Sequence, residues 1–193
     1  MGSPSFALTV GAWIALELGL LVRDAARGRG GPAQDRGTRR LVFLALAGAL
    51  ALGSGLAHLF RADPGLWLPG HGTDAPLATG LGLMWAGLAL RVWSIASLGA
   101  AFRLTVEVDP GQPVVDRGPY RRVRHPSYTG LLLIAAGYGV VTAVWPSLLL
   151  AVVLPLAVLV RRIHVEERAL EVGLGEPYRA YETRTKRLVP GVW

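Results

Sequence analysis

Between Gly118 and Gly130 a cationic, turn-forming segment runs directly into an apolar stretch. It reads Gly-Pro-Tyr-Arg-Arg-Val-Arg-His-Pro-Ser-Tyr-Thr-Gly. Proline suits the first position of a helix, where its missing N–H costs nothing, so Pro126 predicts a helix start with His125 at the N-cap. The free backbone N–H groups of that end, with the three arginines before it, favour an anion such as a carboxylate or phosphate. The same arginines would equally serve to orient the chain in a bilayer, and this segment alone does not decide between the two.

A second segment places opposite charges one helical turn apart. Arg162 and Glu166 are separated by four residues, so on a helix both side chains lie on the same face. Taken alone, this pair is better explained as an ordinary exposed salt bridge. Beside the His-Pro segment, the functional interpretation is favoured, with Arg162 and Glu166 facing one site.

The two segments together resemble the isoprenylcysteine carboxyl methyltransferase family of integral membrane enzymes. The motifs that carry the likeness are Arg-His-Pro-x-Tyr-x-Gly at 124–130, Arg-x-x-x-Glu-Glu-x-x-Leu at 162–170, Gly-x-x-Tyr-x-x-Tyr-x-x-Arg at 175–184 and Arg-Leu-x-Pro at 187–190, with Arg91-Val92-Trp93, Leu98-Gly99 and Phe102 upstream. The likeness covers roughly residues 91–191, while residues 1–90 match only in being membrane helices. It implies methyl transfer from S-adenosylmethionine to the carboxylate of a lipophilic, prenylcysteine-like acceptor.

The resemblance also implies which residues form the site. The cofactor contacts would be Gln112, Pro113, Val114, Val115, Tyr120, His125, Pro126, Ser127, Tyr128 and Glu166. Arg162 would orient the acceptor carboxylate as the catalytic residue, and Arg162 and Arg91 would bind the substrate. Before Gln112, either Val106 or Glu107 aligns with a further polar cofactor contact, and we prefer Glu107.

Such a reaction makes modest chemical demands on the protein. A carboxylate is already ionised at neutral pH, so positioning matters more than a strong base. A carboxylate, helix-end N–H groups, backbone amides and aromatic walls suit the sulfonium, zwitterion, ribose and adenine of the cofactor. No Gly-x-Gly-x-x-Gly follows a predicted strand, so the site must be built from membrane helices and their ends.

Composition restricts the class of protein. The 193 residues are 52% hydrophobic, which is too apolar for an ordinary soluble domain, and we expect a single membrane domain over 1–193. The absence of cysteine excludes disulfides and thiolate metal sites, and the four histidines lack metal-ligand spacing, so we expect no metal. The net charge is +7, and the basic residues lie between the apolar runs, which indicates membrane topology and not nucleic-acid binding.

Apolar runs predict an all-α, polytopic bundle of about five transmembrane helices. The first three cover 5–22, 41–60 and 77–97, with the third continuing into the family-like core at 91–191. The stripe Ala45, Ala49, Gly53 and Ala57 favours close helix packing. The charge-free run 125–160 is divided by Trp145-Pro146 into a helical hairpin. Residues 98–127 form a polar connector with a strand-like 104–108 and a turn at 109–111.

From Arg161 onward we expect an amphipathic helix on the cytoplasmic face. Six arginines in the loop 23–40 make that loop cytoplasmic by the positive-inside rule. The N-terminus then lies outside, and the C-terminus and active site lie in the cytoplasm. The first apolar run reads as a retained helix and not as a signal peptide.

Several assignments stay open. Glu17 would either pair with Arg91 across the bundle or reach toward the cytoplasmic surface, and we favour the second. Tyr178 and Tyr181 fit an apolar stripe, so packing and interfacial anchoring explain them better than catalysis.

The nearest alternative activity is a phospholipid amine N-methyltransferase. It needs a base to take a proton from the amine, and the candidates are His125 and Glu167. A nicotinamide-dependent membrane reductase would need a site for two phosphates, and a non-catalytic scaffold or carrier does not account for so many charges gathered at one membrane face.

Overall fold

The computed structural model describes residues 3–26, 37–104 and 112–193, and within these ranges the chain is helical. The α-helices are α1 (Pro4–Ala26), α3 (Thr38–Phe60), α4 (Ala75–Leu98), α5 (Pro126–Val141), α6 (Trp145–Leu174) and α7 (Glu176–Arg184), with short 3-10 helices η1 (Pro64–Leu66), η2 (Gly99–Ala101) and η3 (Gly118–Arg121). The described ranges contain isolated β-bridges but no strand. The predicted all-α bundle is confirmed.

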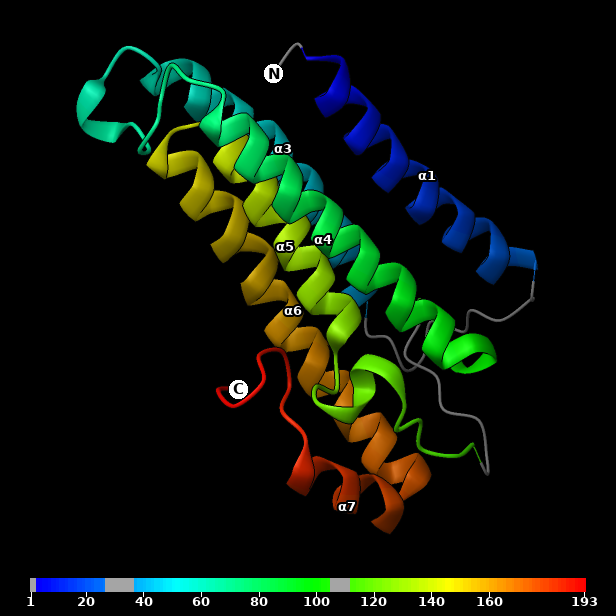
Figure 1. Cartoon of the computed structure of the whole chain (residues 1–193). Helices are drawn as coiled ribbons and strands as arrows, with labels where there is room; N and C mark the ends of the chain where they lie inside the picture. Colours follow the sequence, from blue (N-terminus) through cyan, green and yellow to red (C-terminus); the bar gives the residue numbers. More distant parts are fainter. Residues whose placement is uncertain (1–2, 27–36, 105–111) are drawn as a thin grey trace.

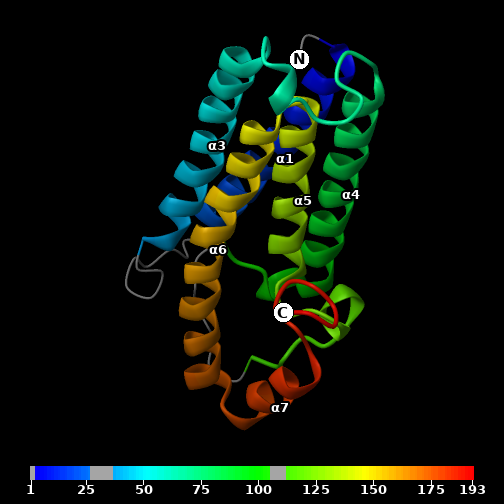
Figure 2. The same cartoon turned by 90° about the vertical axis from the view of Figure 1, so that its left-hand side faces the viewer.

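Four of these helices are long and apolar enough to cross a membrane, namely α1, α3, α4 and α6, and α5 is apolar but shorter. In the views of Figures 1 and 2, α4 packs against α5, α5 against α6 and α6 against α3, while α1 lies against α4. Helix α5 begins one step after the N-cap residue His125, as the sequence predicts. Its first turn lies beside the middle of α6, where Tyr128 contacts Arg162.

The C-terminal helical region differs from the expectation. No separate helix begins at Arg161, because α6 runs unbroken from its apolar half through its charged half to Leu174. It ends where Gly175 takes a positive φ of 62°, which glycine adopts without strain, and α7 follows directly. Figure 1 shows α7 lying across the lower end of α6, beyond the start of α5.

Glycines allow α4 and α5 to approach closely. A Cβ added to Gly87 would lie 2.5 Å from the backbone oxygen of Gly130, and one added to Gly80 would lie 2.5 Å from that of Gly137. Small residues at a helix interface let two backbones come together in this way. On α3 the expected stripe is less uniform, with Ala45, Ala49 and Gly53 buried and Ala57 partly exposed.

The segment after α7 returns to the start of α5. The Arg124 backbone N–H donates to Lys186 O at 2.7 Å and that of His125 donates to Arg187 O at 3.0 Å. The Thr129 hydroxyl donates to Leu188 O at 2.8 Å. These bonds bring the Arg-Leu-x-Pro segment beside the His-Pro segment and fix the N-terminal end of α5.

Candidate functional site

A cavity lies where α5 begins and the charged half of α6 passes it, with a volume of about 1220 Å³ when the open solvent at its mouth is included. Residues from both recognised segments line it. Of the predicted site residues, its lining includes Arg91, Gln112, Pro113, Val114, Val115, Tyr120, His125, Ser127, Tyr128, Arg162 and Glu166. Pro126 is buried at the first position of α5 and is not part of the lining. Glu107 and Val106 lie outside the described residues.

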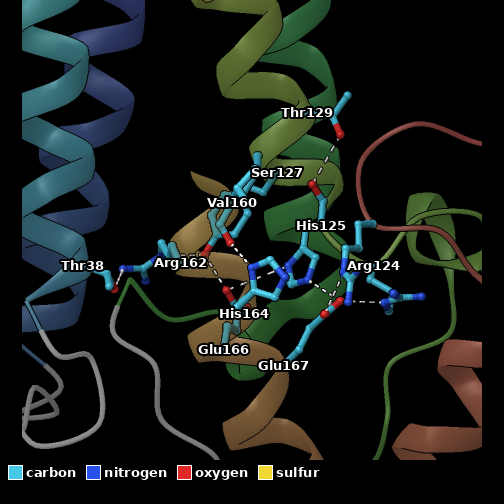
Figure 3. Close-up of polar contacts among 12 residues, drawn as sticks. Thr38, Arg124, His125, Ser127, Thr129, Val160, Arg162, His164, Glu166 and Glu167 are labelled. Carbon is cyan, nitrogen blue, oxygen red and sulfur yellow. Dashed lines mark hydrogen bonds and ion pairs between the residues drawn. The ribbon is translucent and has the colours of Figure 1, made fainter. Parts of the chain in front are cut away.

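The hydroxyl of Tyr128 joins the two charged residues of α6. It accepts a hydrogen bond from Arg162 Nε at 2.7 Å and donates to Glu166 Oε2 at 2.5 Å. Arg162 is only 4% exposed, and its Nη1 donates to Thr38 Oγ1 at 3.1 Å (Figure 3). Its Nη2 donates to Leu104 O at 2.5 Å. The guanidinium is thereby fixed between α3, α5 and α6.

Glu17 pairs with Arg91 across the bundle, so the preference for a surface-directed Glu17 was wrong. Arg91 Nε and Nη2 donate to the two carboxylate oxygens of Glu17 at 2.7 and 2.8 Å. Arg91 Nη1 also donates to Ser127 Oγ at 2.7 Å. An unpaired charge inside the apolar bundle would be costly, and the bidentate ion pair removes that cost. The bond from Arg91 to Ser127 also positions the start of α5.

The Glu167 carboxylate is not part of the cavity lining and contacts three basic side chains. It accepts from Arg124 Nε and Arg187 Nε, each at 2.8 Å, and His125 Nε2 lies 3.4 Å from it (Figure 3). Arg124 also donates to the backbone oxygens of Glu182 and Thr185 at 3.1 and 2.6 Å. The cluster therefore ties α5, α6 and the C-terminal segment together.

Comparison with known proteins gives a match for the part of the chain that contributes many of the residues lining this cavity. Residues 80–172 match the family model described as the isoprenylcysteine carboxyl methyltransferase (ICMT) family. The match covers just under half of the chain, and this segment is similar to the ICMT family. The resemblance read from the motifs is confirmed.

One relative of the chain is the uncharacterized protein YpbQ of Bacillus subtilis (strain 168), 28% identical over 95 residues. The aligned part covers 45% of this chain and 56% of YpbQ, so the chain spans about half the length of that relative. The ICMT match covers α5, nearly all of α6 and most of α4, whereas α1, α3 and α7 lie outside it.

Two tyrosines outside that match also line the cavity, a position that sequence reasoning missed. Tyr178 and Tyr181 of α7 are each 3% exposed, and both belong to the lining. The Tyr181 hydroxyl donates to Tyr120 O at 2.7 Å. The Tyr178 hydroxyl is buried and has no hydrogen-bond partner among the described residues. The Gly-x-x-Tyr-x-x-Tyr motif was the available signal, but it was interpreted as packing.

These α7 phenols are donors at neutral pH. Burial raises the pKa of Tyr178 well above its ordinary value, and the charges of Glu167 and Glu166 raise it further. Burial likewise raises the pKa of Tyr181. A phenol that keeps its proton offers an O–H to a neighbouring acceptor.

The arginines that precede His125 do not act as one group. Arg121 and Arg122 are exposed, whereas Arg124 turns inward to Glu167. His125 stands at the N-cap, but its side chain makes no capping hydrogen bond to α5. Its ring instead stacks on Tyr128, with the ring centres 5.4 Å apart and the planes 5° apart.

Proposed function

We propose that this cavity binds S-adenosylmethionine and that the protein transfers its methyl group to the carboxylate of a lipophilic, prenylcysteine-like acceptor. One observation carries the proposal. The two recognised segments meet at the Tyr128 hydroxyl, which contacts both Arg162 and Glu166 at the wall of a single cavity. The ICMT-family match of the surrounding helices supports methyl transfer as the class of reaction.

The residues present fit such a cofactor. The Glu166 carboxylate and the rings of Tyr120 and Tyr128 suit cationic groups, while Gln112, Val114 and Val115 in the lining carry backbone N–H and C=O groups. Tyr178 lines the cavity, and its hydroxyl, which has no partner among the described residues, offers a donor there. A buried donor without a partner carries a desolvation cost that a bound ligand would relieve.

The apolar part of the cavity lining suits a lipid chain. Apolar side chains from three helices contribute to the lining, namely Val42, Phe43 and Leu46 of α3, Leu98 of α4 and Leu131 of α5. Burial of apolar surface against such a wall stabilises binding by roughly 25 cal/mol per Å². Burial of a long prenyl group there would contribute several kcal/mol to binding of the acceptor. The carboxylate of the acceptor would lie toward the polar residues of the lining.

When bound, S-adenosylmethionine supplies a methyl group on a sulfonium sulfur, whose reaction with a carboxylate gives an ester and a neutral thioether. Arg162 orients the carboxylate in this proposal, sharing its planar donor set between the acceptor and its protein partners. Arg91 acts less directly, since it holds Glu17 and Ser127. No base is needed, because the carboxylate arrives ionised.

The amine-acceptor alternative has fewer candidate bases than the sequence offered. Glu167 is held by two guanidinium groups and does not line the cavity, which leaves His125. An amine must lose a proton before it attacks, so this reading depends on that one ring.

The test uses purified full-length protein in lipid nanodiscs. We expect S-adenosylhomocysteine to bind by calorimetry and single-turnover methyl transfer to reach a farnesylated cysteine analogue but not a phosphatidylethanolamine. Glu166→Gln should weaken S-adenosylhomocysteine by about 1.5–3 kcal/mol, because a hydrogen bond to a charged group is lost. Glu171→Gln, a matched control on the same helix and away from the cavity, should bind like wild type.

Absence of S-adenosylhomocysteine binding to the wild type, or binding of a reduced nicotinamide cofactor in its place, would refute the proposal. Transfer to the phosphatidylethanolamine in place of the acid would move the assignment to the amine reaction.

We also propose that the cavity faces the cytoplasm, with the N-terminus outside. The basis is the basic loop 23–40 and the positive-inside rule. Because the chain contains no cysteine, single substitutions report cleanly on topology. In intact cells an impermeant maleimide should label Asp74→Cys in the loop before α4 and should not label Val192→Cys near the C-terminus, and the reverse pattern would invert the assignment.

A further inference from the structure

The imidazole of His125 lies between two carboxylates that are adjacent in sequence. Its Nε2 is 3.4 Å from Glu167 Oε1, and its Nδ1 is 3.9 Å from Glu166 Oε2. The residue is 4% exposed, and its ring is stacked parallel to that of Tyr128. Burial and stacking fix the plane of the ring, so each nitrogen keeps its own neighbour.

The two carboxylates differ in what they offer the ring. Glu167 is within hydrogen-bonding distance, and the guanidinium groups of Arg124 and Arg187 hold it as an ionised acceptor. Glu166 lies beyond that distance and already accepts from the Tyr128 hydroxyl. A carboxylate accepts and does not donate, so the nitrogen that faces Glu167 must carry the proton. In the neutral ring the other nitrogen is then a bare acceptor.

We infer that Glu167 is a positioning residue that holds His125 as the Nε2–H tautomer and so turns its Nδ1 lone pair toward Glu166 and the cavity. Together Nδ1 and the Glu166 carboxylate form an acceptor pair on the cavity wall. That pair suits a ligand with cationic N–H donors, which in chemical class is a primary ammonium. The identity of the ligand rests on the proposed function, where the ammonium of the amino-acid moiety of S-adenosylhomocysteine has this chemistry.

The chain contains an internal reference of the opposite kind. His164 is exposed on α6, and its Nδ1 lies 2.7 Å from Val160 O. A carbonyl oxygen only accepts, so His164 is assigned as the Nδ1–H tautomer. The two histidines should therefore give opposite patterns in one long-range ¹H–¹⁵N spectrum of histidine-labelled protein.

The experiment records that spectrum on the full chain in nanodiscs, with signals assigned through His125→Gln and His164→Gln. We expect the Nε2–H pattern for His125 in the wild type. In Glu167→Gln the side-chain amide both donates and accepts, so His125 should lose its single tautomer. The dissociation constant of S-adenosylhomocysteine should rise roughly three- to tenfold, the loss of about one hydrogen bond.

Arg187→Gln is the matched control. It removes the contact to Glu167 Oε2, at a side chain that is 30% exposed, but leaves Glu167 beside His125. We expect a lower melting temperature with the tautomer and the affinity of the wild type. If Glu167→Gln does not fold, the wild-type spectrum and this control still decide the assignment.

An Nδ1–H pattern for His125 in the wild type would overturn the inference. A Glu167→Gln variant that melts earlier but keeps the wild-type tautomer and affinity would also overturn it, since Glu167 would then only stabilise the fold. In that case S-adenosylhomocysteine would still bind, and the proposed function would stand. Absence of S-adenosylhomocysteine binding to the wild type would instead refute the proposed function and the ligand named here.

Discussion

Replacing Tyr128 by phenylalanine separates the polar junction of the cavity from its shape. Phenylalanine keeps the aromatic ring that stacks on His125 but loses the hydroxyl between Arg162 and Glu166. Both lost hydrogen bonds involve a charged group. The substitution therefore tests whether this hydroxyl organises the site or only fills space.

The size of the effect follows from the two partners. A hydrogen bond to a charged group contributes about 1.5–3 kcal/mol. The Glu166 side chain is 29% exposed, so water replaces its lost donor, whereas buried Arg162 keeps Thr38 and Leu104 as acceptors but loses one. We therefore expect destabilisation by about one such bond, roughly 1.5–3 kcal/mol, and not by two. With Glu166 released, S-adenosylhomocysteine should bind about tenfold more weakly, which corresponds to about 1.4 kcal/mol.

The assay combines thermal unfolding with calorimetric titration of S-adenosylhomocysteine, and Tyr138→Phe is the matched control on the same helix. The Tyr138 hydroxyl donates to Leu50 O at 2.7 Å and contacts Ser54, and Tyr138 does not line the large cavity. Its loss should lower stability and leave affinity unchanged. If the two variants lose the same stability and both bind like wild type, the Tyr128 hydroxyl is structural and the reasoning fails.

Three further substitutions test other parts of the structure. Tyr178→Phe removes a hydroxyl that has no partner among the described residues, so the variant should melt at or above the wild-type temperature without ligand yet bind S-adenosylhomocysteine more weakly. Tyr181→Phe, the control, should lose about 1 kcal/mol of stability, and early melting of Tyr178→Phe would mean that its hydroxyl has a partner. Gly87→Ala should lower the free energy of unfolding by about 1–3 kcal/mol in denaturant titration, because its Cβ would meet the backbone of α5. Gly82→Ala, where an added Cβ has nothing within 4 Å, should lower it far less, and equal losses would disprove the close helix contact. Arg162→Lys should keep cofactor affinity nearly intact but slow single-turnover transfer to a farnesylated cysteine analogue by up to about a hundredfold, and equal turnover would remove Arg162 from acceptor orientation.

Local rules predicted much of the bundle. Runs of apolar residues of sufficient length indicated α1, α3 and α4, and Trp145-Pro146 marked the boundary between α5 and α6. The proline rule placed the start of α5 at Pro126 with His125 as its N-cap. Each of these features depends on residues close together in the chain.

Tertiary contacts could not be predicted in the same way. The end of α6 was missed because charge alone does not stop a helix, and only Gly175 does so. The Glu17–Arg91 pair joins residues 74 positions apart. It forms only because α1 packs against α4, which the local sequence around neither residue predicts. The glycines of the α4–α5 contact look like ordinary membrane glycines until the facing backbone is known.

The cavity draws on two parts of the chain with different sequence character. The polar wall formed by His125, Tyr128 and Glu166 comes from the ICMT-matched segment. Yet Arg91 and Arg162 of that segment are held by Glu17 of α1 and Thr38 of α3, which lie outside the match. Helix α3 also supplies much of the apolar lining. The α3 part of the apolar wall lies outside the family match, whereas Leu98 and Leu131 lie inside it. We therefore infer that changes at Val42, Phe43 or Leu46, whose apolar side chains take no part in the hydrogen bonds of Arg91 and Arg162, alter which lipophilic acid is accepted more than they alter the groups that act on its carboxylate.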